Sequence, residues 1–101
     1  MQATMALAER VSSATYEAIP DNAREVAKQA IMDFIGVTLA GSDEPLTKIL
    51  IDEAAEQGGN AQASVIGAGL RTSTTQAALI NGAAGHAHDY DDVHTAMSGH
   101  P

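Results

Sequence analysis

The sequence contains no cysteine and no tryptophan, and it has only one phenylalanine and two tyrosines in 101 residues. The lack of cysteine excludes a disulfide framework and a thiolate metal site. Apolar residues still make up 45% of the chain, and the small residues alanine and glycine are frequent. A core of this kind suits closely packed helices but buries less area per residue than an aromatic core. We therefore expect a small domain of low stability.

Basic residues are also scarce, because five Lys and Arg stand against thirteen Asp and Glu, for a formal net charge of -8. This balance argues against nucleic acid and against anionic membranes as partners, since both require basic patches. No segment approaches the ~20 apolar residues that span a bilayer. The N-terminus lacks the apolar core of a secretory signal. We expect a soluble, cytoplasmic protein.

Hydrophobic periodicity predicts an all-α chain of about four helices with one short β-prone segment. The first helix is expected over residues 4–14, and Pro20 separates it from the second. The second helix should begin near Asp21 or Asn22 and end near Gly41. Its apolar residues recur at i, i+3 and i+4 and should be buried. They are Ala23, Val26, Ala27, Ala30, Ile31, Phe34 and Ile35.

A third helix should follow a cap at Ser42 or Asp43, with Pro45 in its first turn. The sequence "QGGN" should end this helix. Its expected buried stripe comprises Leu46, Ile49 and Leu50.

The segment 63–69, "ASVIGAG", is β-prone and is bounded by glycine. A fourth helix is expected from about Thr75 to His86 or beyond, and its residues are unusually small. Because glycine inside a helix costs about 0.5–1 kcal/mol relative to alanine, Gly82 and Gly85 should be kept for close approach of a backbone or a ligand.

All four histidines lie between residues 86 and 100, and "HAHDYDDVH" (86–94) places three of them beside three aspartates. Imidazole and carboxylate ligands suit zinc, iron or manganese. This interpretation gives a small stand-alone helical metal-binding protein that uses His86, His88 and His94. However, the segment has no ligand spacing with a mechanism of its own.

Two other interpretations of the segment remain open. It is either a polar turn after a helix, where histidine interacts well with the helix dipole, or an acid–base and substrate-holding site. Histidine titrates near neutral pH, and nearby carboxylates raise its pKa and fix its tautomer. A small-residue helix leading into the segment would leave room for a small ligand. Fitting reactions include proton abstraction next to a carboxylate, elimination of water, epimerisation and decarboxylation.

The stretch "ALINGAAGHAHDYDDVH", followed by "GHP", closely resembles the signature of the MmgE/PrpD family. That family includes 2-methylcitrate dehydratase, cis-aconitate decarboxylase and iminodisuccinate epimerase. The segment "LAERVSSATYEAIPDNAREVAKQAIMDFIGVTLAGSDEP" is similar to the opening helices of the family, and "ASVIGAGLRTSTTQAALINGAAGHA" to its next stretch. The resemblance covers nearly all 101 residues.

This resemblance implies a large helical domain with a smaller α/β lid domain, an active site between them, and a homodimer. Residues 1–101 would be an incomplete N-terminal portion of the helical domain, without the lid. The resemblance implies that no metal and no other cofactor is needed. It also implies a small carboxylic-acid substrate and catalytic lysines from outside these residues.

By the same resemblance, Asp89 takes the place of a functional aspartate, and His100 that of a substrate-contacting histidine. Both are our candidates for catalysis and substrate binding. The decarboxylase branch has threonine where this chain has Val93, which cannot donate a hydrogen bond. We therefore expect a lyase or isomerase that most resembles 2-methylcitrate dehydratase. Asp91 and Asp92 are expected to have structural roles, such as capping.

Overall fold

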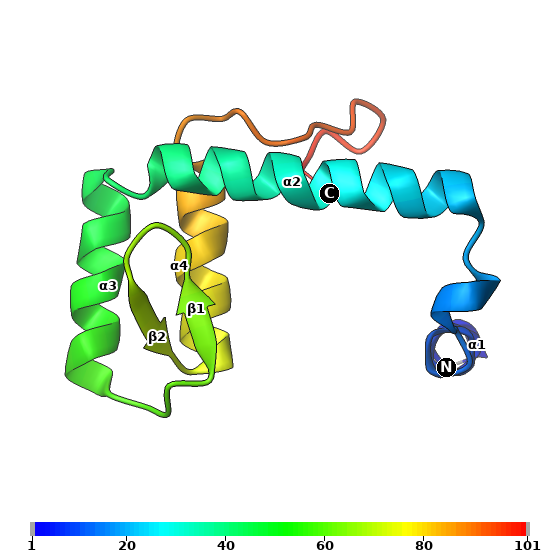
Figure 1. Ribbon diagram of the computed structural model, residues 1–101, viewed down its shortest axis with the longest axis horizontal. Coiled ribbons are helices and arrows are strands. Elements are labelled where there is room, and N and C mark those ends of the chain that lie inside the picture. The colour runs from blue at the N-terminus through cyan, green and yellow to red at the C-terminus, as the bar shows by residue number, and fades with distance from the viewer. Residues whose placement is uncertain (1, 101) are drawn as a thin grey trace. The chain divides into compact units, whose positions relative to one another are not determined.

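A computed structural model describes residues 2–100 of the chain, and Met1 and Pro101, the last residue of the "GHP" motif, lie outside them. The chain divides into two compact units, one up to Ala30 and one from Ile31 onward. Its elements, drawn in Figure 1, are mostly helical, as predicted. In chain order they are α1 (Gln2–Ser12), η1 (Tyr16–Ala18), α2 (Asp21–Gly41), α3 (Pro45–Gln57), β1 (Ala63–Val65), β2 (Leu70–Thr72) and α4 (Thr74–His86).

The first unit holds α1, the short 3-10 helix η1 and the beginning of α2. α1 begins two residues before the predicted helix and buries none of its residues. The Arg24 guanidinium donates to the Tyr16 carbonyl at 3.0 Å and lies 4.7 Å from the centre of the Tyr16 ring. It also pairs with Asp21, the first residue of α2. These contacts fix the turn between η1 and α2.

The bounds of α2 agree with the prediction, but the predicted buried stripe is wrong. Val26, Ile31, Phe34 and Ile35 are between 41% and 64% exposed. The buried residues of α2 are instead Thr38 and Gly41. The apolar periodicity therefore identified the helix but not the face that this structure covers.

The covered face of α2 is the one that α4 approaches through small residues. A Cβ atom on Gly41 would collide with the backbone carbonyl of Ala84. A Cβ atom on Gly85 would lie only 2.8 Å from Cε2 of Phe34 and 3.2 Å from Oγ1 of Thr38. The predicted close approach at Gly85 is therefore confirmed. At Gly82 the predicted approach of a backbone is wrong for the described residues, because an added Cβ would meet nothing within 4 Å, and the alternative of an approaching ligand stays a prediction.

α3 begins after Glu44, which makes no capping hydrogen bond with its side chain, so the predicted cap at Ser42 or Asp43 is wrong. The Ser42 hydroxyl donates backward to the Leu39 carbonyl at 2.8 Å. Pro45 opens the helix as predicted, since its missing N–H needs no partner there.

The buried stripe of α3 also differs from the prediction. Leu46 and Ile49 are 50% and 65% exposed, whereas Thr47 and Ala54 are buried and Leu50 is half-buried. The Thr47 hydroxyl donates to the Gly41 carbonyl at 2.8 Å. The same carbonyl, at the C-terminal end of α2, also accepts the Glu44 N–H at 3.2 Å. The bond gives the buried Thr47 hydroxyl a partner.

The β-prone segment forms the first strand of a two-stranded antiparallel hairpin, with Ala63 opposite Thr72 and Val65 opposite Leu70. The second strand, Leu70–Thr72, was not predicted. Asn81 joins the hairpin to α4. Its Oδ1 accepts from the Ile66 N–H at 2.9 Å, and its Nδ2 donates to the Ser64 carbonyl at 3.0 Å.

The core lies between α3, the hairpin and α4, which lie next to one another in Figure 1. α4 begins after Ser73, whose hydroxyl accepts the Gln76 N–H and caps the helix. The buried apolar residues of the core are Ala54, Val65, Ala77 and Ile80, and Leu50, Ile51, Ala63 and Leu70 pack against them. This core gives α4 a fixed position, and α4 ends at His86, where the histidine-rich segment begins.

Within residues 2–100, no helix is both long and apolar enough to cross a membrane.

Candidate functional site: the histidine–aspartate cluster

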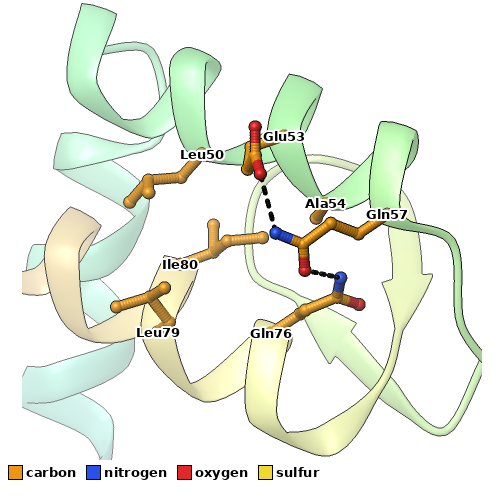
Figure 2. Close-up of a pocket in the computed structure, with 7 residues that line it drawn as sticks. All are labelled: Leu50, Glu53, Ala54, Gln57, Gln76, Leu79 and Ile80. Atoms are coloured by element: carbon orange, nitrogen blue, oxygen red, sulfur yellow. Dashed lines mark hydrogen bonds between the residues drawn. The ribbon is translucent and has the colours of Figure 1, made fainter.

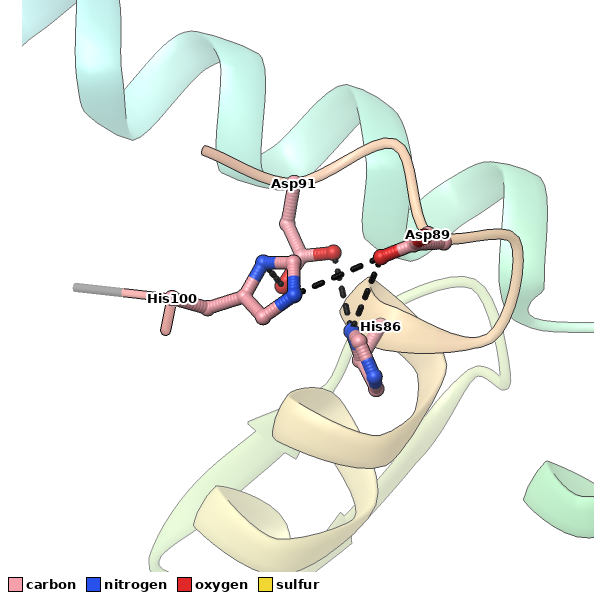
Figure 3. Close-up of side chains that lie close together, drawn as sticks. All are labelled: His86, Asp89, Asp91 and His100. Atoms are coloured by element: carbon pink, nitrogen blue, oxygen red, sulfur yellow. Dashed lines mark hydrogen bonds and ion pairs between the residues drawn. The ribbon is translucent and has the colours of Figure 1, made fainter. Parts of the chain in front are cut away.

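Four side chains from the end of α4 and the following loop converge, and we call them the His–Asp cluster. They are His86, Asp89, Asp91 and His100 (Figure 3). One nitrogen or oxygen atom from each lies within 4.8 Å of the corresponding atoms of the other three. The cluster therefore combines the two candidates for catalysis, Asp89 and His100, with His86, which was a candidate only as a metal ligand, and with Asp91, which was expected to be structural.

The end of α4 positions His86 and Asp89. The Asp89 N–H donates to the His86 carbonyl at 2.9 Å, which closes a turn just beyond the helix. Asp89 has a φ of 55°, in the left-handed region that aspartate tolerates better than most residues. The turn directs the Asp89 carboxylate back toward the helix end, where its Oδ1 lies 3.9 Å from His86 Nδ1.

Asp91 bridges the two histidines of the cluster. Its Oδ1 lies 3.0 Å from His86 Nδ1, and its Oδ2 lies 3.2 Å from His100 Nδ1. The Asp91 side chain is 19% exposed, whereas that of Asp89 is 76% exposed. Asp91 was expected to cap the loop or a helix through backbone groups. In this structure its carboxylate instead fixes two imidazole rings.

His100 reaches the cluster because the chain folds back on itself after His94. The His94 N–H donates to the Gly99 carbonyl at 2.8 Å, and this bridge brings the last described residues next to the end of α4. His100 Nε2 then lies 3.3 Å from Asp89 Oδ1, and Nδ1 lies 2.9 Å from the Asp92 carbonyl. The ring packs edge-on against that of His86, with centres 4.5 Å apart.

The interactions within the cluster shift the pKa values of His86 and Asp91. The hydrogen bond to Asp91, together with the charges of Asp91 and Asp89, raises the pKa of His86 above its ordinary value. The same hydrogen bond holds the pKa of Asp91 below its ordinary value, with smaller help from the charges of His100 and His86. The pair therefore favours an imidazolium next to a carboxylate.

The ligand set proposed from the sequence, His86 with His88 and His94, is not brought together. His88 Nε2 lies 3.2 Å from the Ala40 carbonyl and 3.4 Å from Glu44, and the ring stacks on Tyr90. The metal-capable group found among residues 2–100 includes neither His88 nor His94. The helix ends at His86, so these side chains do not align at helical spacing.

The basic residue closest to the segment in sequence is not part of the site. Arg71, on β2, donates to the Ala61 and Gln62 carbonyls at 3.3 and 2.9 Å. No lysine or arginine in the described part of the chain forms a salt bridge with the His–Asp cluster. Val93 is 60% exposed in the loop.

Sequence reasoning named His86 only as a metal ligand together with His88 and His94, and it missed Asp91 as a member of the site. The available signal was the spacing of His86, Asp89 and Asp91 immediately after a helix of small residues. It was not decisive, because a helical and a turn conformation place these three side chains in different directions. The left-handed conformation of Asp89 resolves the choice in favour of the turn.

A separate shallow pocket of about 40 Å³ lies between α3 and α4 (Figure 2). Its polar side chains bond to one another: Gln57 donates to Glu53 at 2.7 Å, and Gln76 donates to Gln57 at 3.3 Å. Its other lining residues are Leu50, Ala54, Leu79 and Ile80. This volume is enough for only one or two water molecules, so the pocket is too small to be a substrate site.

Comparison with known proteins identifies the family to which the chain belongs. The model of the MmgE/PrpD N-terminal domain matches residues 5–101. The chain is a member of the MmgE/PrpD family, which is enzymatic and dehydratase-like. Searches among curated proteins and among solved structures found no match.

Proposed function

We propose that this chain contributes Asp89 and His100 to the active site of a lyase or isomerase that acts on small di- or tricarboxylic acids. Dehydration of 2-methylcitrate is the reaction we favour. The observation that carries the proposal is the pairing of Asp89 Oδ1 with His100 Nε2 at 3.3 Å, within a chain of a dehydratase-like family.

Elimination of water requires two proton transfers. A base removes a proton from the carbon next to a carboxylate, the C–H electrons form the new double bond, and the C–O bond breaks. The departing oxygen takes up a proton and leaves as water. A paired imidazole and carboxylate suits the second transfer, because the pair holds a proton within hydrogen-bond reach of a bound hydroxyl.

In this proposal His100 carries the proton at Nε2, or donates it in a hydrogen bond to a substrate carboxylate. Asp89 orients the ring or accepts a hydrogen bond from the substrate hydroxyl. The Asp91 carboxylate and the Asp92 carbonyl both lie within 3.2 Å of His100 Nδ1 and favour a proton there. Such a contact on one ring nitrogen determines the tautomer and leaves the other nitrogen for chemistry.

The charge of the site indicates what else the reaction requires. The substrate is a polyanion, and Asp89 and Asp91 would repel it in the absence of nearby cations. Arg71 is held by backbone carbonyls elsewhere. We therefore propose that cationic groups from outside these residues complete the site. The resemblance to the family supports two further proposals: residues 1–101 act as the N-terminal part of a larger helical domain with a lid, and the enzyme is a homodimer.

Val93 favours dehydration over decarboxylation within this proposal. Valine has no hydrogen-bond donor in its side chain, whereas the decarboxylase branch that the motif resembles has threonine at this position. A carboxylate that must leave as carbon dioxide would lose that contact.

The test is turnover of 2-methylcitrate by the enzyme as expressed from the gene that encodes this chain. We expect His100→Gln to lower kcat by at least ~100-fold, the usual scale of general acid–base catalysis. His94→Gln is the matched control and should keep wild-type turnover, because His94 lies outside the cluster. Wild-type turnover by both variants would refute the role of His100, and no turnover of any carboxylic acid by the wild type would refute the proposed reaction.

A further inference from the structure

We propose that the His–Asp cluster is also a binding site for a zinc-class transition-metal ion, with His86 Nδ1, Asp89, Asp91 and His100 Nε2 as its ligands. The proposal goes beyond the proposed lyase activity, which is expected to require no metal. It concerns a different chemical property of the same four side chains.

The ligand types support an ion of this class. Two imidazole nitrogens with two carboxylates form a mixed set that zinc and its neighbours bind, whereas magnesium and calcium prefer oxygen ligands. With both imidazoles neutral, the four side chains carry two negative charges. As no lysine or arginine in residues 2–100 forms a salt bridge with them, a divalent cation would neutralise the cluster.

The spacing is close to that of a coordination sphere. At metal–ligand distances of about 2.0–2.2 Å, neighbouring ligand atoms in a tetrahedral zinc site lie roughly 3.3–3.5 Å apart. His86 Nδ1 lies 3.0 Å from an Asp91 oxygen and 3.9 Å from an Asp89 oxygen, and His100 Nε2 lies 3.3 Å from Asp89. One nitrogen or oxygen atom from each of the four side chains lies within 4.8 Å of those of the other three. Small side-chain movements on the exposed loop would therefore suffice to enclose an ion.

The surroundings of His100 add an independent feature. A histidine that binds a metal through one ring nitrogen usually donates its other N–H to a backbone carbonyl or a carboxylate, which fixes the ring. His100 Nδ1 lies 2.9 Å from the Asp92 carbonyl, which leaves Nε2 directed at the cluster. This supporting carbonyl distinguishes the group from an ordinary acidic patch on the surface.

Binding would have a consequence that rests on the proposed function. A metal ion held by Asp89 and His100 occupies the two groups that would contact the substrate, so zinc would inhibit the enzyme competitively. Binding itself does not depend on that function and is measured without substrate.

The experiment is calorimetric titration of zinc chloride into the 101-residue chain at about pH 8, because metal affinity rises as the ligands lose their protons. We expect saturable one-to-one binding that magnesium does not reproduce. Asp91→Asn should weaken it by at least about tenfold. His88→Gln and His94→Gln are matched controls, and both should bind like the wild type.

A second measurement makes the site identifiable even where a variant loses structure. Zinc added to the wild-type chain should shift the imidazole NMR signals of His86 and His100 and leave those of His88 and His94 in place. Absence of saturable binding, or equal shifts at all four histidines, would overturn the proposed site. Zinc binding without 2-methylcitrate turnover would refute only the proposed function, and turnover without zinc binding would refute only this inference.

Discussion

The core around α4 and the loop that follows it are held by different forces. The core is apolar and well covered: Ala77, Ile80 and Ala84 are each at most 2% exposed. The loop from residue 87 to residue 100 has no buried residue and is held by hydrogen bonds and by ion pairs between histidine and carboxylate. A change in the core should therefore alter stability, whereas a change in the loop should alter chemistry and pH response.

The largest expected effect on the core comes from Ile80→Ala. Ile80 is 1% exposed at the centre of the core, and its truncation should lower the free energy of unfolding by about 2–5 kcal/mol. Urea unfolding followed by circular dichroism measures this loss. Leu79→Ala is the control, because Leu79 is 61% exposed on the same helix and should change stability by at most about 0.5 kcal/mol. Equal losses in both variants would mean that the core has been placed wrongly.

Two glycines of α4, Gly82 and Gly85, test the packing of this helix further. Gly85→Ala should cost about 1–3 kcal/mol, because the new methyl group would press against Phe34 and Thr38. Gly82→Ala should instead stabilise the chain by about 0.5–1 kcal/mol, since it meets no neighbour and restricts the unfolded chain. The same unfolding assay compares them. Two changes of the same sign would contradict the proposed approach of α4 to α2 at Gly85.

A smaller effect is expected on the pH dependence of stability, which should involve the loop and not the core. The raised pKa of His86 gives stability that is present below its ordinary value of 6.5 and is lost as the pH rises through the folded-state pKa. The lowered pKa of Asp91 gives stability that is present above its ordinary value of 3.8 and is lost as the pH falls through the folded-state pKa. The contribution of the pair should thus be complete between these two values and fade on either side.

The measurement is the free energy of unfolding of the wild type and of Asp91→Asn across this pH range. The difference between them should be largest inside the window and should shrink above it, as His86 loses its proton. A difference that does not vary with pH would mean that Asp91 acts through packing alone. The Ile80→Ala loss should persist on both sides of the window, because no titrating group is involved.

The sequence predicted some features of the fold better than others. Helix existence and ends were predicted well for α2 and α4, because Pro20 and Gly41 mark the limits of α2 and the change of composition after His86 marks the end of α4. The buried faces of α2 and α3 were predicted poorly. Thr47 and Thr38 are buried because their hydroxyls bond to the Gly41 and Phe34 carbonyls, and hydrophobic periodicity does not detect a buried polar group.

For the site, the family motif predicted Asp89 and His100 as catalytic and substrate-binding residues, and these roles stay predictions. Their convergence with His86 and Asp91 depends on the left-handed turn at Asp89 and on the bridge between His94 and Gly99. Neither feature produces a periodic pattern in the sequence. The ligand set with His88 and His94 was wrong because His88 turns toward Ala40 and Glu44, which lie more than forty residues earlier in the chain.

The most direct test of the account is an NMR comparison of the four imidazole groups in the wild type and in Asp91→Asn. Asp91 is the residue through which the cluster is connected, so its replacement should shift the signals of His86 and His100 and lower the pKa of His86 toward its ordinary value. The signals of His88 and His94 should keep their positions. If all four histidines respond alike, or if His86 and His100 do not respond, the four side chains do not converge and the site described here does not exist.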